Sequence, residues 1–380
     1  MVGNSFYQVI GDTFSLWLPP SRRRGLEFPV IPAGGTMSTN PTLAAEGGVD
    51  RRDFLDASLA MLLGSAAAAL APPARAQADP AFQRPARGST LRFFPGFKPI
   101  QIRTSGATIN GVMGGKGLPV LLLQGFPQTH VEWHRIAPML ARDFTVVATD
   151  LRGYGDSSKP PEGQNHEGYS KRAIGVDQVE VMSQLGFDRF AVVGHDRGGR
   201  VAHRMALDHS DRVTRLAVLD IVPTYKLYAT VTKEFATAYF HWFFLIQPAP
   251  FPETLLNNNA DFVLRTLFGT LIPDVVTEDA YAEYLRCFKS PETLHAMCED
   301  YRAAATVDLE HDKSDLGTSI KCPLLVLWGR NGAMHRLYDV LATWKERGSD
   351  VRGKALPGGH FLPEQLPDQL HAELRPFLAP

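Results

Sequence analysis

The residues best suited to chemistry lie in the stretch GHDRGG at 194–199, where an aspartate stands among glycines. An apolar, strand-like run precedes this stretch and a helical pattern follows it, which is the pattern of a nucleophile elbow with aspartate in place of serine. Glycines suit the elbow because the turn is tight and the following helix packs closely on the sheet. The amino terminus of that helix favours an ionised carboxylate. The pattern predicts that Asp196 is a nucleophile.

A carboxylate nucleophile changes the expected chemistry. A serine at this position attacks an acyl carbon, whereas a carboxylate can displace a leaving group from a saturated carbon and form an ester. Hydrolysis of that ester needs a base. The stretch GGHFLPEQLP near the end supplies His360 in a glycine-rich loop after the last predicted strand.

The acid that orients this histidine can follow either of two strands. After the later strand the sequence is WGRNGAM, with Asn331 and no acid close by. After the earlier strand it is LAVLDI, and Asp220 lies at the strand end. We therefore expect Asp220 to fix the tautomer of His360 and to stabilise its imidazolium.

The elements that must position these residues alternate between short apolar runs and helix-length periodic segments. This alternation predicts an α/β fold with a mostly parallel sheet flanked by helices. The apolar runs that we expect to form strands are 119–126, 144–153, 190–196, 216–221 and 323–329.

About a hundred residues between the last two of these runs show helical patterns and no convincing strand. Because ligands of open parallel sheets sit beyond the carboxyl ends of the strands, a helical insertion there would cover the site. We assign 223–312 to a cap inserted after the sixth strand. The α/β-hydrolase core would then consist of 79–222 and 313–380.

Residues 1–78 resemble a bacterial export signal. RRDFL at 51–55 precedes a small-residue apolar run and an A-x-A site ending at Ala78, which is the layout of a twin-arginine signal. The expectation is an exported, periplasmic protein, or a cytoplasmic one if the signal does not function. The alternative is an amphipathic or disordered tail. The arginine pair lies far into the chain, so our hypothesis is that Met37, rather than Met1, is the initiator.

The composition limits the partners. With 39 basic and 40 acidic residues the formal net charge is −1, so nothing favours nucleic acid binding. The three cysteines have no CxxC spacing, and a disulfide between Cys287 and Cys298 has no support. There is no metal-ligand spacing or phosphate-binding loop, so we expect no cofactor. The apolar run near residue 60 is too short to span a membrane, so stable membrane association is not expected.

Several segments together resemble the fluoroacetate and haloacetate dehalogenases of the α/β-hydrolase superfamily. The resemblance covers about residue 90 to the end and depends on five segments: GHDRGGRVAHRMALDH, LAVLDIVPTY, HWFFLIQPAPFPE, MCEDYRA and GGHFLPEQLPDQ. GHDxGG alone also occurs in epoxide hydrolases and haloalkane dehalogenases, so the cap segments make the distinction. The resemblance implies a small haloacid as substrate and a homodimer.

The resemblance also implies roles for individual residues. Asp196 would be the nucleophile, with His360 and Asp220 as base and orienting acid. Arg197 and Arg200, one helical turn apart, would bind the substrate carboxylate. The halide would be bound by donors from the cap, namely His241, Trp242 and Tyr301. Fluoride is a poor leaving group, so donors aimed at its developing charge would lower the barrier.

Two features depart from the family. Gln124 stands where this fold commonly has histidine in an HGFP turn, which we expect to alter loop hydrogen bonds without removing catalysis. The backbone N–H groups of Phe126 and Arg197 would still form the oxyanion hole. The export signal is the second departure.

Two alternative functions remain open. An epoxide hydrolase shares the aspartate nucleophile and would use cap tyrosines, for which Tyr301, Tyr239 and Tyr225 are available. Against it stand the adjacent His241 and Trp242 together with the arginine pair, because an uncharged epoxide has no use for two cations beside the nucleophile. A non-catalytic, hydrolase-like binding protein is the other alternative, and the complete set of nucleophile, base and acid speaks against it.

Overall fold

A computed structural model describes residues 89–379. The predicted export signal and the choice between Met1 and Met37 lie outside this range. The described chain contains an eight-stranded sheet with the order β1-β2-β4-β3-β5-β6-β7-β8. The strands are β1 (Lys98–Arg103), β2 (Thr108–Gly115), β3 (Leu118–Leu123), β4 (Phe144–Thr149), β5 (Phe190–His195), β6 (Val213–Leu219), β7 (Leu324–Gly329) and β8 (Val351–Leu356).

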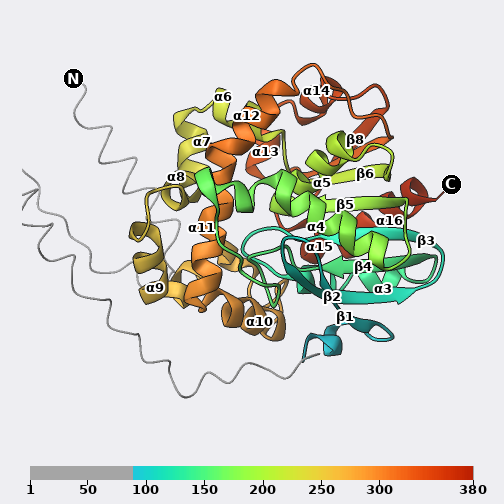
Figure 1. The fold of residues 1–380 in the computed structure, drawn as a ribbon, viewed down its shortest axis with the longest axis horizontal. Helices are drawn as coiled ribbons and strands as arrows, with labels where there is room; N and C mark the ends of the chain where they lie inside the picture. Colours follow the sequence, from blue (N-terminus) through green and yellow to red (C-terminus); the bar gives the residue numbers. More distant parts are fainter. Residues whose placement is uncertain (1–88, 380) are drawn as a thin grey trace, which may run out of the picture. The chain divides into compact units, whose positions relative to one another are not determined.

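The sheet is antiparallel only at one edge. β1 pairs with β2, and β2 with β4, in antiparallel register, whereas all other neighbours are parallel. Every residue of β5 and of β7 is buried, as expected for parallel strands covered on both faces. The sequence therefore predicted the fold class correctly, including its mostly parallel sheet (Figure 1).

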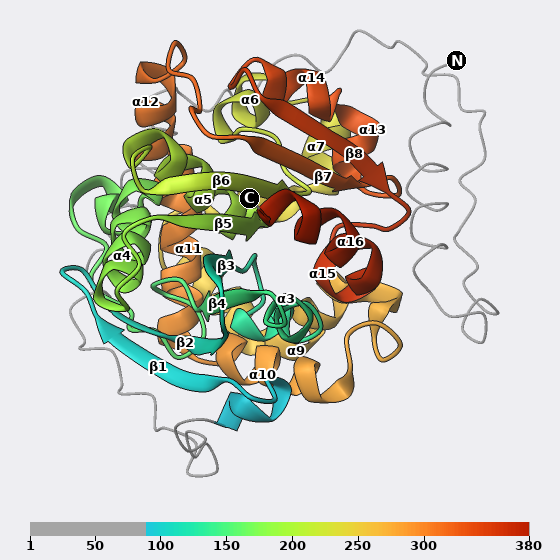
Figure 2. The same ribbon diagram turned by 90° about the vertical axis from the view of Figure 1, so that its right-hand side faces the viewer.

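Helices cover both faces of the sheet. Figure 2 shows α4 and α5 on one side of it and α3 and α16 on the other. The side chain of Ser170 caps α4 by accepting a hydrogen bond from the N–H of Ala173. The core helices are α3 (Ala137–Leu140), α4 (Lys171–Gln184), α5 (Asp196–Asp208), α13 (Ala333–Leu337), α14 (Val340–Lys345), α15 (Leu362–Gln365) and α16 (Pro367–Leu378).

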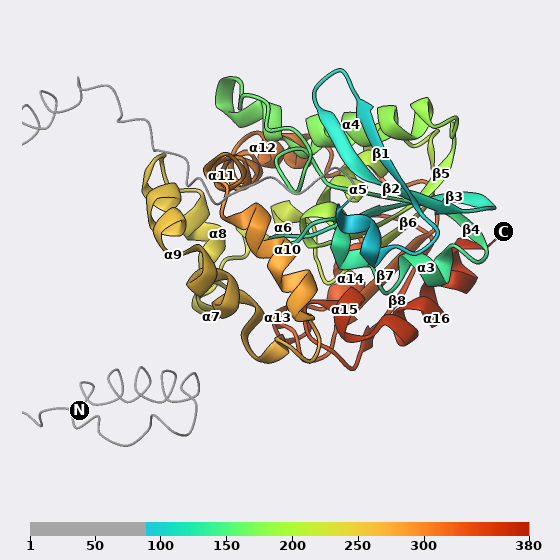
Figure 3. The same ribbon diagram turned by 90° about the horizontal axis from the view of Figure 1, so that it is seen from below.

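A helical cap is inserted between β6 and β7, as expected after the sixth strand. Thr277 and Ser290 begin α10 and α11 as side-chain caps. Figures 1 and 3 show α9 farther from the sheet than α10 and α11. The cap helices are α6 (Thr224–Ala229), α7 (Lys233–Ala238), α8 (Phe240–Leu245), α9 (Phe251–Phe268), α10 (Glu278–Phe288), α11 (Pro291–Ala305) and α12 (Val307–Ser314).

Short 3-10 turns complete the described chain. They are η3 (Ser89–Phe93), η4 (His130–Trp133), η5 (Gln164–Tyr169) and η6 (Gly269–Leu271). No helix within residues 89–379 is long and apolar enough to cross a membrane.

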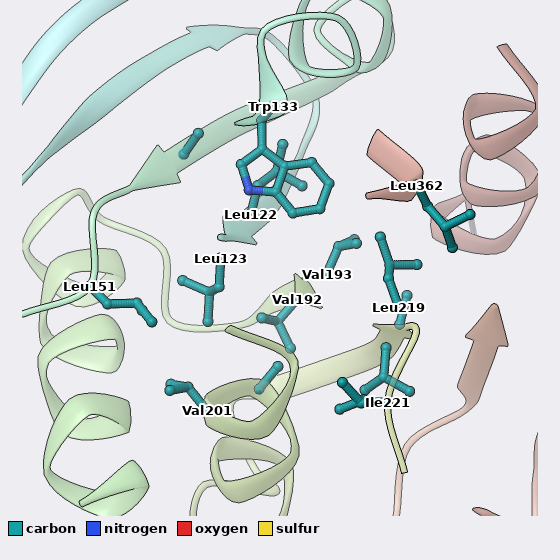
Figure 4. Close-up of a cluster of buried hydrophobic side chains, with 14 of the residues drawn as sticks. Leu122, Leu123, Trp133, Leu151, Val192, Val193, Val201, Leu219, Ile221 and Leu362 are labelled. Carbon is teal, nitrogen blue, oxygen red and sulfur yellow. The ribbon is translucent and has the colours of Figure 1, made fainter. Parts of the chain in front are cut away.

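The core lies directly beneath the turn from β5 to α5. Leu123, Val193, Val201 and Leu219 come from different elements and have no exposed surface (Figure 4). Full burial of a side chain of this size contributes about 1.5–3 kcal/mol to stability. This packing gives the turn a rigid support.

The strand boundaries differ from the sequence-based expectation in one systematic way. β3 ends at Leu123 and β4 at Thr149, several residues before the ends of the apolar runs that predicted them. The extra residues turn away at the carboxyl edge of the sheet, where the polar side chains of the site are found. β1, β2 and β8 were not among the strands assigned to these runs.

Candidate active site

The turn between β5 and α5 presents Asp196. Its backbone φ is 43°, in the left-handed region that a nucleophile elbow requires. Gly198 allows the helix to pack there, because a Cβ at this position would lie 2.2 Å from the carbonyl oxygen of Leu123. A Cβ at Gly194 would likewise lie 2.4 Å from the carbonyl oxygen of Gly198. The GHDRGG sequence therefore folds as the elbow that its pattern predicts.

The backbone N–H of Phe126 donates a hydrogen bond to Oδ1 of Asp196 at 3.1 Å. Because an ester on Asp196 would place its carbonyl oxygen here, this donor is suited to an oxyanion hole for ester hydrolysis. It leaves Oδ2 to attack a substrate. Arg197, whose N–H we expected as the second donor, follows Asp196 directly as the second residue of α5.

The loop that carries Phe126 is held by hydrogen bonds to its backbone. The N–H of Gly125 donates to Oε2 of Glu132 at 2.9 Å, and the carbonyl of Gln124 accepts from the N–H of Gly198, also at 2.9 Å. The side-chain amide of Gln124 is fully buried and makes no hydrogen bond within residues 89–379. The loop is thus held through its backbone, including the carbonyl of Gln124, and not through the side chain of that residue.

The carboxyl of Asp196 is buried, with 4% of its surface exposed. Burial by itself would raise its pKa. The charges of His360 and of the two neighbouring arginines outweigh burial and lower the pKa of Asp196 below its ordinary value. The residue is therefore ionised at neutral pH, as a nucleophile must be.

His360 and Asp220 lie together at the carboxyl edge of the sheet. Nδ1 of the imidazole is 2.6 Å from Oδ2 of Asp220. The other carboxylate oxygen accepts the N–H of Gly329 at 2.9 Å, which fixes the carboxylate at the end of β7. Asp220 has a φ of 52° and follows β6 directly. The pairing leaves Nε2 of His360 as the base nitrogen.

Arg197 is buried and already partly engaged. Its Nε donates to Oδ2 of Asp300 at 2.6 Å, and Nη2 donates to the carbonyl of the same residue at 2.7 Å. Nη1 is buried without a partner in the described part of the chain. The arginine thus offers one N–H edge, not a free two-pronged fork, to a substrate.

Arg200 is held in a similar way. Its Nη1 donates to the carbonyl of Val222 and to Oγ1 of Thr224, each at 3.0 Å. Nε is buried and unpaired within residues 89–379. The guanidinium carbons of Arg197 and Arg200 lie 5.4 and 4.5 Å from the ring centroid of Trp242, so the two side chains converge on one indole.

The three cap residues expected to bind halide also gather here. The rings of Trp242 and Tyr301 meet edge to face at 5.7 Å, and His241 lies 6.0 Å from Tyr301. Nε1 of Trp242 and Oη of Tyr301 are buried and lack a partner in the described structure. Burial lowers the pKa of His241 to about 4 although the residue keeps some exposed surface, so its ring is neutral at pH 7.

The structure adds residues that we did not single out from the sequence. Asp300 precedes Tyr301 in the quoted segment MCEDYRA, and its acidic character was the only signal available. His195 precedes the nucleophile, and its Nε2 lies 2.8 Å from the carbonyl oxygen of His360. Its Nδ1 lies 3.1 Å from Oε1 of Glu132, close enough for an ion pair but not aligned for a hydrogen bond.

The charge of Glu132 acts on His195. Burial lowers the pKa of His195, but the nearby carboxylates outweigh burial and raise it to about 9.

No group of three or more side chains within residues 89–379 is arranged to hold a metal ion. The arrangement as a whole combines an ionised carboxylate, a histidine base and unpaired N–H and O–H donors.

Comparisons with known proteins agree with this geometry. The family model for the alpha/beta hydrolase fold matches residues 119–365. The chain is 47% identical over 289 residues to a fluoroacetate dehalogenase from Burkholderia sp., covering 75% of this chain and 95% of that protein. It is 34% identical over 286 residues to a soluble epoxide hydrolase from Corynebacterium sp. strain C12, covering 74% and 96%.

A solved structure of an alpha/beta hydrolase from Nostoc sp. PCC 7120 matches with a TM-score of 0.73 and 57% identity, covering 74% of this chain and 98% of that one. The sheet order, the elbow and the cap are thus accompanied by similarity over most of the described sequence. The chain belongs to the haloacetate dehalogenase family of the α/β hydrolases.

Proposed function

We propose that the protein hydrolyses haloacetates to glycolate and halide through a covalent ester on Asp196. The observation that carries the proposal is the pair of buried arginines beside this carboxylate, because Nη1 of Arg197 and Nε of Arg200 are buried and have no hydrogen-bond partner within residues 89–379. A buried N–H group without an acceptor is costly, so two such donors on cationic side chains favour an anionic ligand. A haloacetate brings a carboxylate to the arginines and a carbon–halogen bond to the nucleophile.

In the first step Oδ2 of Asp196 attacks the carbon that bears the halogen. The new carbon–oxygen bond forms as the carbon–halogen bond breaks, and the halide leaves with the bonding electron pair. The donors of Trp242, Tyr301 and His241 receive the developing negative charge. Because His241 is neutral, it acts as an N–H donor and adds no full charge.

In the second step Nε2 of His360 takes a proton from water, and the resulting hydroxide attacks the carboxyl carbon of Asp196. Oδ1 becomes the oxyanion and is stabilised by the N–H of Phe126. Collapse of this intermediate breaks the bond between Oδ2 and the carboxyl carbon of Asp196, and glycolate leaves with that oxygen, which takes the proton held by His360. The acid left on Asp196 then releases a proton to restore the carboxylate. The sum is haloacetate and water giving glycolate, halide and one proton.

An epoxide hydrolase is the second candidate. Tyr301 and Tyr239 both interact electrostatically with Asp196, and a pair of cap tyrosines could protonate an opening epoxide. The similarity to a soluble epoxide hydrolase adds to this reading. The arginine pair argues against it, because an epoxide has no carboxylate to accept hydrogen bonds from Nη1 of Arg197 and Nε of Arg200.

The test is halide release from fluoroacetate and chloroacetate at neutral pH, with Asp196→Asn as the blank and an aryl epoxide as rival substrate. We expect the parent to release halide and the variant to lose at least about 1,000-fold in rate. Release of chloride alone would retain the class and withdraw fluoride. Diol formation without halide would move the assignment to epoxide hydrolase.

We also propose that the precursor is exported by the twin-arginine machinery, on the strength of the RRDFL segment and the A-x-A site. Replacing Arg51 and Arg52 by lysines should hold the protein in the cytoplasm of a bacterial host. Fractionation followed by immunoblotting measures this. Periplasmic protein in unchanged amount would contradict the proposal.

A further inference from the structure

Asp300, a cap residue on α11, receives hydrogen bonds from three core side chains. Nε of Arg197 lies 2.6 Å from its Oδ2, and the hydroxyl of Tyr154 donates to the same oxygen at 2.8 Å. Nζ of Lys171 on α4 donates to Oδ1. All four side chains are buried, so water does not screen these contacts.

Asp300 accepts two hydrogen bonds from the guanidinium of Arg197. A guanidinium has five N–H groups in a rigid plane. Asp300 takes Nε through its carboxylate and Nη2 through its backbone carbonyl, which fixes the plane at two points. The unpaired Nη1 therefore has one defined direction.

Lys171 is held as firmly as Asp300. Its Nζ lies 3.3 Å from Oδ2 of Asp308 on α12, and its backbone N–H donates to Oδ1 of the same residue at 2.8 Å. Burial alone would raise the pKa of Asp300, but the charges of Arg197 and Lys171 outweigh burial and keep it well below its usual value. The carboxylate of Asp300 is therefore ionised at neutral pH and can accept hydrogen bonds from Arg197.

We infer that Asp300 and Lys171 are positioning residues, which aim Nη1 of Arg197 at the carboxylate of the substrate. The inference rests on the proposed function. It assigns to the cap, through Asp300, a part in recognising the carboxylate of the substrate. Tyr301, a proposed halide donor, follows Asp300 on the same turn of α11. One helical turn of the cap thus sets the binding of both ends of a haloacetate.

Charge and position make opposite predictions for Asp300→Asn. The substitution removes a negative charge near the site, so long-range electrostatics alone would strengthen the binding of an anion. Loss of the fixed guanidinium plane would weaken it, because a misaligned donor loses most of its hydrogen bond. The sign of the change therefore separates positioning from a general field effect.

The experiment measures the dissociation constant of glycolate by titration calorimetry, which needs no turnover. We expect Asp300→Asn to bind glycolate about tenfold more weakly than the parent, the equivalent of one charge-assisted hydrogen bond. KM for chloroacetate should rise similarly, with a smaller change in kcat. Tyr154→Phe, which removes a single hydroxyl, should shift both in the same direction by less.

Arg172→Met is the matched control, because Arg172 is the neighbour of Lys171 on α4 and pairs with Asp208 at the surface. Glycolate affinity should be unchanged in this variant and reduced in Lys171→Met. Melting temperatures establish that each variant is folded. If Asp300→Asn does not fold, Tyr154→Phe decides the question.

Equal or tighter binding of glycolate by folded Asp300→Asn would overturn the inference, as would unchanged binding by Tyr154→Phe where that variant decides. A parent that does not bind glycolate would overturn it too. A parent that binds glycolate but releases no halide from chloroacetate would sink the proposed function alone. In that case the glycolate series still supports or contradicts the positioning role.

Discussion

Nδ1 of His360 lies 2.6 Å from Oδ2 of Asp220, although 140 residues separate the two in sequence. The acid is fixed independently of the histidine, because its other oxygen accepts the N–H of Gly329. The imidazole therefore docks against a carboxylate that is already in place. A substitution of His360 should therefore leave the carboxylate of Asp220 in place.

Replacing His360 by Gln should separate the two chemical steps. Formation of the ester by Asp196 does not use the base, whereas hydrolysis of the ester does. We expect about one equivalent of chloride per site from chloroacetate, followed by no further turnover. Intact-mass measurement should show one carboxymethyl group on the protein, and absence of both the burst and the adduct would refute the two-step scheme.

Removing the halide donors should affect fluoride more than chloride. Tyr301→Phe retains the ring and loses one buried donor, and Trp242→Phe loses its donor while replacing the indole by a smaller aromatic ring. We expect kcat for fluoroacetate to fall by about 10- to 100-fold and kcat for chloroacetate to fall less, because fluoride is the poorer leaving group. Tyr281→Phe, whose hydroxyl donates to Asp261 in the cap, is the control. Equal losses for both substrates would count against a halide role.

Gly198→Ala should damage the elbow. The added methyl group would lie 2.2 Å from the carbonyl oxygen of Leu123, and neither backbone can move without disturbing the sheet. We expect a loss of at least about 1–3 kcal/mol in unfolding free energy together with loss of activity. Gly317→Ala is the control, since a Cβ there meets no atom within 4 Å. Denaturant unfolding compares the two, and an equally small change in both would show that the elbow tolerates a side chain.

Glu364 should make stability depend on pH. Burial, aided by the charge of Glu132, raises its pKa from 4.5 to about 8 in the folded protein, although a hydrogen bond from Tyr284 opposes the shift. Between these values the folded state binds a proton that the unfolded state has released. The free energy of unfolding therefore falls as pH rises through this range, by at most about 1.4 kcal/mol per pH unit.

Glu364→Gln removes this dependence, so its melting temperature relative to the parent should rise from pH 5.5 to 8 and level off above. Glu310→Gln makes the same chemical change at an exposed position and is the control. A difference between Glu364→Gln and the parent that stays constant with pH would contradict the raised pKa.

Sequence patterns predicted the central parallel strands well, but they assigned no residues to the parallel edge strand β8 or to the antiparallel strands β1 and β2. The strands β3, β5 and β7 read as continuous apolar runs because both of their faces are covered. β1 has the sequence KPIQIR with mostly exposed residues, and β2 contains three glycines, so neither has a strong strand pattern. Such strands are held mainly by backbone hydrogen bonds to a neighbouring strand, which a local sequence pattern does not reveal.

The same distinction applies to the site. The sequence around Asp196 is informative because the elbow is a local structure in which each glycine has a steric role. The partner of Arg197 is Asp300, 103 residues away, and no local pattern reveals such a pairing. The engagement of Arg197 by a cap carboxylate was therefore visible only once the fold had brought α5 and α11 together.

The insertion point of the cap has an evolutionary consequence. β6 and β7 are hydrogen-bonded neighbours, with Leu216 opposite Leu324 and Leu219 opposite Leu327, so the chain leaves and re-enters the sheet between adjacent strands. A lineage could exchange or enlarge this excursion without altering the pairing of the sheet. Such an exchange would preserve the hydrolytic machinery and change the substrates, but a recruited cap would have to restore an acidic partner for Arg197.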